Sequence, residues 1–145
     1  MIDIVVARLT HIKWVLQLES ALQNKRKVIK IDSHKKCELG KCLYSSATDE
    51  YETIPEIHLL EKEHKLFHVA ADKVVKWHNR TDPSARADAQ ALLDFEEVQR
   101  RSKEVIFLLT LIEFKMVEAE LIKQTPIKDM LSNQFDTAKK LFMKE

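Results

Sequence analysis

The sequence predicts an all-α fold: an antiparallel four-helix bundle with a short cysteine-bearing helix between helices 1 and 3 and an additional C-terminal helix. Two observations predict it. The 145 residues include one glycine and three prolines, so few residues interrupt a helix. Apolar residues recur three and four positions apart through most of the chain. The length suits one domain with a hydrophobic core.

Charge and hydropathy exclude several kinds of partner. Positive and negative residues are dispersed and give a formal net charge of +1, so we expect no nucleic-acid binding. The first residues lack the basic start and apolar core of a signal peptide. The longest apolar run, residues 105–112, is too short to span a membrane. We therefore expect a cytoplasmic protein whose two cysteines are a metal ligand, redox sensor or core residue rather than a disulfide.

The first helix is expected over residues 2–24. Two stripes follow helical spacing: Ile4, Ala7, His11, Trp14, Leu18 and Leu22 form one, and Val5, Leu9, Ile12 and Leu16 form the other. Both sides of this helix should therefore be covered. His11 lies within the first stripe, where it is either a core histidine with one hydrogen-bond partner or a ligand.

A polar, basic connector leads to a short second helix. Asp32 or Ser33 can cap this helix, which should start near His34. It carries both cysteines and the only glycine, Gly40. That glycine marks a helix end, a positive φ, or a backbone that passes close to another segment. Cys37 is either a small buried residue or a ligand.

The third helix is expected over residues 55–80, with a proline in its first turn. Its apolar stripe contains His64 and His68, which lie four residues apart and therefore on one face. Burying two imidazoles is costly unless each finds a partner, and one metal ion would satisfy both. We interpret His58 and His78 as solvated or capping residues.

An aspartate and a proline at positions 82–83 begin a fourth helix that runs to about Lys123. Residues 105–117 are apolar nearly all round, which one face of a bundle cannot bury. Either the last helix or a second copy of the chain must cover them, and we predict a homodimer through this half of the helix. A second cap-and-proline signal starts an amphipathic helix. The predicted domains are therefore a bundle over residues 1–124 and a C-terminal helix over residues 125–145.

Four side chains from separate elements could form one metal site: His11, Cys37, His64 and His68. Three neutral imidazoles and one thiolate make a tetrahedral, moderately soft set of donors, which suits Zn²⁺ best. Four protein ligands leave no position for a water molecule. The pattern therefore predicts a structural or sensory site and no enzyme activity.

The order of these motifs resembles the chemoreceptor zinc-binding domain family. The resemblance covers roughly residues 1–120 and lies in three pieces: His11-x-x-Trp14, then Asp32-x-His34-x-x-Cys37-x-x-Gly40-Lys41, then His64-x-x-x-His68. It implies the same four ligands. The chain departs from the family at Cys42, because a tryptophan commonly follows the Gly-Lys pair.

The family occurs in bacterial chemoreceptors and diguanylate cyclases and as free-standing proteins. The resemblance implies a helical bundle, often a symmetric dimer, and cytosolic zinc sensing in chemotaxis or cyclic-di-GMP signalling. In some members the zinc-bound thiolate reacts with oxidants. We therefore hypothesise that loss of the Cys37 thiolate frees the short helix while the long helices stay packed. A disulfide from Cys37 to Cys42 is awkward if both lie in one regular helix.

Three alternatives remain at this level. A di-iron carboxylate bundle needs two glutamate–histidine motifs, and the sequence has one copy, Glu61-x-x-His64. A hemerythrin-like oxygen carrier could use His34 and Glu38, but it leaves Cys37 unexplained. The third is a helical interaction module with core histidines and no metal.

Overall fold

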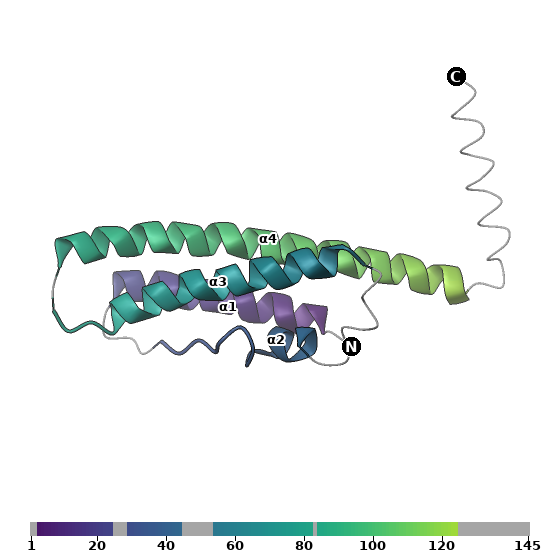
Figure 1. The fold of residues 1–145 in the computed structure, drawn as a ribbon, viewed down its shortest axis with the longest axis horizontal. Helices are drawn as coiled ribbons and strands as arrows, with labels where there is room; N and C mark the ends of the chain where they lie inside the picture. Colours follow the sequence, from purple (N-terminus) through teal and green to yellow (C-terminus); the bar gives the residue numbers. More distant parts are fainter. Residues whose placement is uncertain (1–2, 25–28, 45–53, 83, 125–145) are drawn as a thin grey trace, which may run out of the picture. The chain divides into compact units, whose positions relative to one another are not determined.

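The computed structural model describes residues 3–24, 29–44, 54–82 and 84–124. Within them the fold is all-helical, as predicted, with helices α1 (Ile4–Gln23), α2 (Glu38–Leu43), α3 (Glu56–His78) and α4 (Ala85–Gln124) (Figure 1). The predicted C-terminal helix over 125–145 lies outside the described residues. None of the four helices carries, over its described residues, an apolar stretch long enough to cross a membrane.

The chain divides into two compact units, Met1–Ile112 and Glu113–Glu145. The first unit contains α1, α2, α3 and most of α4, so it holds every residue of the predicted metal site.

Helix α1 begins where the sequence places a capping residue. The Asp3 carboxylate accepts a hydrogen bond from the Val6 amide at 3.0 Å, which satisfies one of the free amides of the first turn. The predicted cap of α4 is different. The Ser84 hydroxyl, not Asp82, accepts from the Ala87 amide at 3.2 Å. A serine directly before the helix outcompetes an aspartate placed two residues earlier.

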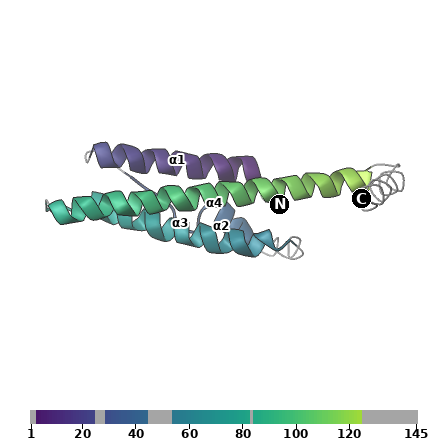
Figure 2. The same ribbon diagram turned by 90° about the horizontal axis from the view of Figure 1, so that it is seen from above.

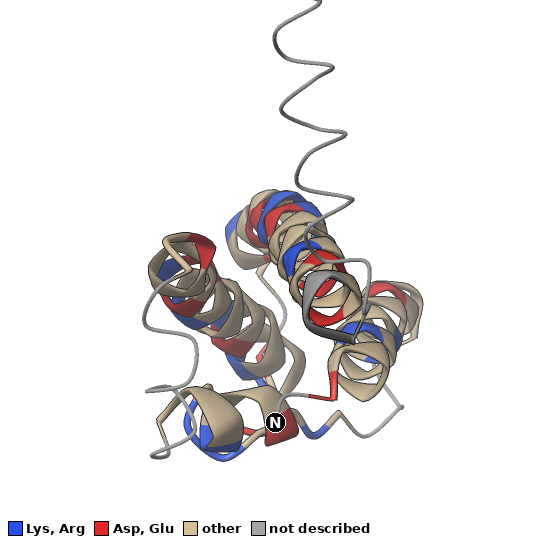
Figure 3. Ribbon diagram, turned by 90° about the vertical axis from the view of Figure 1, so that its right-hand side faces the viewer, with Lys and Arg blue, Asp and Glu red and all other residues tan. Residues whose placement is uncertain are grey.

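Within the first unit, helices α1 and α3 lie side by side and run in the same direction, while residues 85–112 of α4 run antiparallel to both and lie along them (Figures 1 and 2). The predicted antiparallel relation therefore holds for α4 against its two neighbours. It does not hold between α1 and α3, because residues 29–43 return the chain to the end at which α1 began. Helix α2 lies on the side opposite α4, and acidic and basic residues alternate around the long helices (Figure 3).

The core of this unit is aliphatic and aromatic. Its largest fully buried apolar side chains are Leu18, Leu39, Leu60, Phe67, Val74, Val98, Val105, Leu109 and Ile112. Each contributes about 1.5–3 kcal/mol through removal of apolar surface from water. These residues come from all four helices, and α2 contributes one of them, Leu39.

Three polar contacts tie α4 to its neighbours. Arg101 pairs with Glu63 of α3 through two hydrogen bonds, of 3.1 and 2.8 Å. The Trp77 indole donates to Asp88 at 2.8 Å. An Arg8 guanidinium nitrogen of α1 donates to the Thr110 hydroxyl at 3.1 Å. Because these contacts lie at different levels, they fix how far α4 is displaced along the other helices.

One expected feature of α1 is wrong for a single chain. The second stripe was expected to be covered, yet Val5, Leu9, Ile12 and Leu16 are 53%, 60%, 37% and 58% exposed. Helical spacing shows that these residues share a face, but it does not say what covers that face. Within the described residues of one chain, the stripe is open to solvent.

Candidate metal centre

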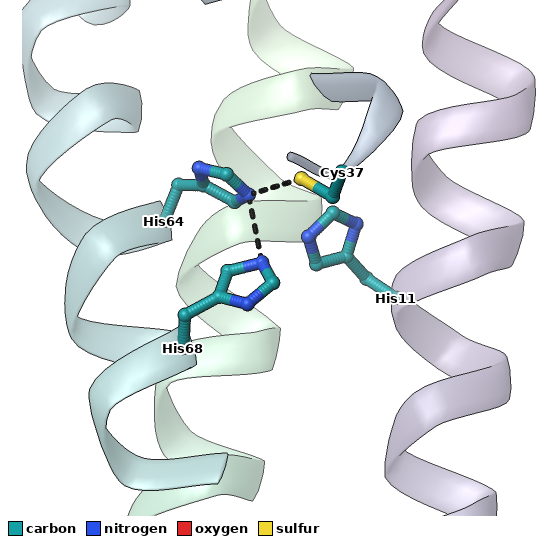
Figure 4. Close-up of side chains that lie close together, drawn as sticks. All are labelled: His11, Cys37, His64 and His68. Atoms are coloured by element: carbon teal, nitrogen blue, oxygen red, sulfur yellow. Dashed lines mark hydrogen bonds between the residues drawn. The ribbon is translucent and has the colours of Figure 1, made fainter. Parts of the chain in front are cut away.

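Four side chains converge between α1, α2 and α3: His11, Cys37, His64 and His68 (Figure 4). One potential ligand atom from each lies within 4.8 Å of the other three. All four residues are buried. The structure therefore brings together the four residues that the sequence nominated, from three separate elements.

Helix α1 supplies His11 from its buried stripe. The Nδ1–H of this ring donates to the Ala7 carbonyl oxygen at 2.7 Å, one turn earlier in the helix. This bond fixes the tautomer, so Nε2 carries the free lone pair. That Nε2 atom is buried and has no hydrogen-bond partner among the described residues. A buried lone pair without a partner is costly, and a metal ion would satisfy it.

Helix α3 supplies His64 and His68, which project from consecutive turns toward one point (Figure 4). Their Nε2 atoms lie 3.0 Å apart, and the His64 Nε2 lies 3.1 Å from the Cys37 Sγ. The backbone of Asp32 accepts a hydrogen bond from His68 and orients this ring. Such outer contacts are what ligating histidines commonly have.

Helix α2 supplies Cys37 as its N-cap, and the Gly40 amide donates to Sγ at 3.2 Å. The short helix begins at Glu38, so the predicted start near His34 with a cap at Asp32 or Ser33 is wrong. Residues 34–36 form a turn instead, in which the Ser33 carbonyl accepts from the Cys37 amide at 3.1 Å.

Gly40 is required for a close approach of two backbone segments. A Cβ at this position would lie 1.7 Å from the carbonyl oxygen of His34. Its φ is not positive, so of the three possibilities raised by the sequence the close approach is the one observed. The contact holds α2 against the turn that precedes Cys37.

Burial keeps all four groups neutral in the absence of an ion. It lowers the pKa of His11, although the bond to Ala7 partly opposes this. Burial and the neighbouring imidazoles lower the pKa of His64 to about 2, and that of His68 to about 3. Burial also raises the pKa of the Cys37 thiol. A neutral set of three imidazoles and one thiol fits a cation that converts the thiol to a thiolate.

The donors fit zinc better than iron. Three nitrogens and one sulfur match the ligands and the four-coordinate geometry that Zn²⁺ prefers. The cluster contains no carboxylate among the described residues, whereas a di-iron site is built largely from glutamates. The number of donors also leaves no open position at which water could be activated.

The other histidines and the second cysteine lie outside this cluster. His58 is exposed, as predicted, but His78 is only 7% exposed, so its interpretation as a solvated residue is wrong. The sequence did contain a signal for this burial, because His78 follows the spacing of the apolar stripe of α3. Cys42 is half-buried, and neither cysteine forms a disulfide among the described residues. The length of α2 separates Cys42 from Cys37 by more than one turn.

One residue near the cluster, His34, was considered as a ligand only in the hemerythrin-like alternative. The ring of His34 lies 6.4 Å from that of His68, centroid to centroid, beside a cavity of about 460 Å³. The sequence did contain a signal, because His34 precedes Cys37 by three residues.

Comparison with known proteins gives one match. Residues 11–75 match the profile of the family described as the chemoreceptor zinc-binding domain. This segment contains all four clustered residues and ends within α3. No curated protein and no solved structure matches the chain.

Proposed function

We propose that this chain is a zinc sensor of the chemoreceptor zinc-binding domain family, whose profile residues 11–75 match. It binds one Zn²⁺ through His11, Cys37, His64 and His68 and passes a signal to a partner protein. The observation that carries this proposal is the convergence of four buried donor atoms within 4.8 Å. The unpartnered Nε2 of His11 supports it independently, because the described residues offer that atom no hydrogen bond.

The four ligands differ in how firmly the fold holds them. His11, His64 and His68 are on helices of 20 and 23 residues, whereas Cys37 caps a helix of six. Cys37 is also the only one of the four that must lose a proton to bind zinc. We infer that the protonation or oxidation of Cys37 controls the position of α2, while α1 and α3 stay packed. Zinc level or an oxidant is then the signal.

A second copy of the chain is the partner that we propose for the exposed apolar surface. Within the first unit, two exposed apolar features support a dimer. One is the open stripe of α1, and the other is Phe107 of α4, which is 61% exposed. In the second unit, Phe114 is 65% exposed and supports it separately. Sedimentation of the wild-type chain should give a dimer, and Leu9→Glu should weaken it. A monomer at high protein concentration would contradict this part of the proposal.

The biological setting that we propose is cytoplasmic signalling in bacteria, with a chemoreceptor or a diguanylate cyclase as the regulated partner. The family match supports this, and so does a cluster without an open coordination position, which suits a sensor better than an enzyme.

Metal analysis of the purified protein tests the proposal most directly. We expect one zinc per chain for the wild type. Alanine at any of the four ligands should weaken zinc binding by more than the 10–100-fold that loss of an outer contact typically costs. His58→Ala is the matched control, since it removes an exposed histidine from the same helix. A wild type without zinc, or a Cys37→Ala variant with undiminished affinity, would overturn the proposal.

A further inference from the structure

We propose that His34 is a reserve zinc ligand, whose imidazole enters the coordination sphere when Cys37 leaves it. The site would then have two four-ligand states, one with three imidazoles and a thiolate and one with four imidazoles. This inference rests on the proposed zinc function and adds a ligand that the family match does not assign.

The position of His34 is the first argument. Its ring centroid lies 6.4 Å from that of His68, while the ring of His11, a proposed ligand, lies 5.7 Å from the same ring. The ring of His34 is therefore almost as near to the His68 ring as the ring of His11 is. It is not itself in the cluster, which contains only the four residues named above among those the structure describes.

The second argument is the space available for the ring to move. His34 and His68 both line the cavity of about 460 Å³, together with residues 31–33 and the adjoining face of α3. The half-buried ring of His34 can thus rotate toward His68 through open space. None of the residues that line the cavity is among the fully buried apolar side chains of the core.

The third argument is what holds the ring in its present place. The ring of His34 packs edge-on against Tyr44, with centroids 5.8 Å apart, and Tyr44 is the C-cap of α2. Cys37 is the N-cap of the same helix. A displacement of α2 therefore removes the Cys37 sulfur and releases the His34 ring in one movement.

The exchange is a simple ligand substitution. The bond from zinc to sulfur breaks, the sulfur takes a proton from solvent, and a bond from zinc to an imidazole nitrogen forms, with no change of oxidation state. Imidazole is an ordinary ligand of zinc, but it is neutral, so the four-histidine state should bind more weakly than the thiolate state. The chain could then release α2 without releasing the ion.

Zinc affinity, measured by competition with a chelator, tests this through a pair of double variants. Cys37→Ala should still bind zinc. Adding His34→Ala should weaken that binding by a further tenfold or more. Loss of an outer contact alone typically costs at least about tenfold, and loss of a ligand should cost no less. Adding His58→Ala instead should leave it unchanged. His34→Ala alone should leave the zinc affinity close to that of the wild type, because His34 is not a ligand while Cys37 is bound.

Equal affinities for Cys37→Ala and for the variant that also lacks His34 would overturn the inference. So would a Cys37→Ala protein that binds no zinc, or a large loss in His34→Ala alone. Failure of the proposed function is distinguishable, because the wild type itself would then bind no zinc. His34→Gln in the Cys37→Ala background, together with the helical content of each variant, separates lost ligation from lost folding. Cobalt substitution gives a second readout, because the intense visible bands of a four-coordinate ion should survive in Cys37→Ala and fade when His34 is also removed.

Discussion

Replacement of Gly40 by alanine tests whether the backbone contact beneath α2 sets the metal affinity. The added Cβ would lie 1.7 Å from the His34 carbonyl oxygen, whereas such contacts are essentially never below 3.0 Å, so the two segments must separate by about 1.3 Å. Both sides of this contact are backbone, so no flexible side chain can absorb the shift. Cys37 lies between the two segments, and its Sγ is 3.1 Å from the His64 Nε2. A shift of this size exceeds the roughly 0.5 Å within which ligand constellations must be held.

We therefore expect Gly40→Ala to weaken zinc binding by about 10–100-fold, the range found when a contact behind a ligand is lost. Chelator competition measures this, with Lys41→Ala as the control because it alters an exposed side chain of the same short helix. Circular dichroism without zinc should show unchanged helical content, since the three long helices do not depend on this contact. Wild-type zinc affinity in Gly40→Ala would refute the reasoning.

Three further predictions concern protonation and packing. Zinc binding at pH 7 should release about one proton, from Cys37, because burial raises the pKa of its thiol and keeps the imidazoles neutral. Calorimetry in buffers of different ionisation enthalpy measures this, and a release well above one proton would show that histidine ligands are charged in the metal-free protein. The metal-free protein should lose stability as the pH falls below about 6.5, because the unfolded chain then binds protons that buried His64 and His68 cannot. The loss should be on the order of 1 kcal/mol for each between pH 7 and 5.5, and a denaturation midpoint that does not change over this interval would contradict it. Glu63→Gln should lower the free energy of unfolding by about 1 kcal/mol in urea denaturation, because it weakens a partly buried ion pair with Arg101. A destabilisation no larger than that of the exposed-surface change Lys41→Ala would show that the pair contributes little.

The helices and the histidine pair could be predicted from the sequence because both depend on local periodicity. The apolar stripe of α3 runs from Ile57 to His78 at regular spacing, and every member of it is buried. Periodicity places His64 and His68 on that buried face without any knowledge of the neighbouring helices. The same argument places His11 on the inner face of α1.

What the sequence could not provide is the path between the helices. The parallel run of α1 and α3 depends on residues 29–43 returning the chain, and no periodicity encodes that return. The approach of Gly40 to His34 depends on the same path, as does the distance from His34 to His68. The open stripe of α1 has a different cause, since an apolar face indicates burial but does not identify the surface that buries it.

Because the four ligands come from three separate elements, a bound ion would act as a cross-link between distant parts of the chain. Cys37 and His64 are 27 positions apart, and His11 and Cys37 are separated by a similar length of chain. An ion that joins them closes two loops at once and so restricts the unfolded chain, as a disulfide does. Each doubling of a loop adds only about 0.6 kcal/mol to the entropic cost of closing it. Residues inserted between His11 and Cys37, or between Cys37 and His64, should therefore weaken zinc binding far less than a single methyl group added at position 40.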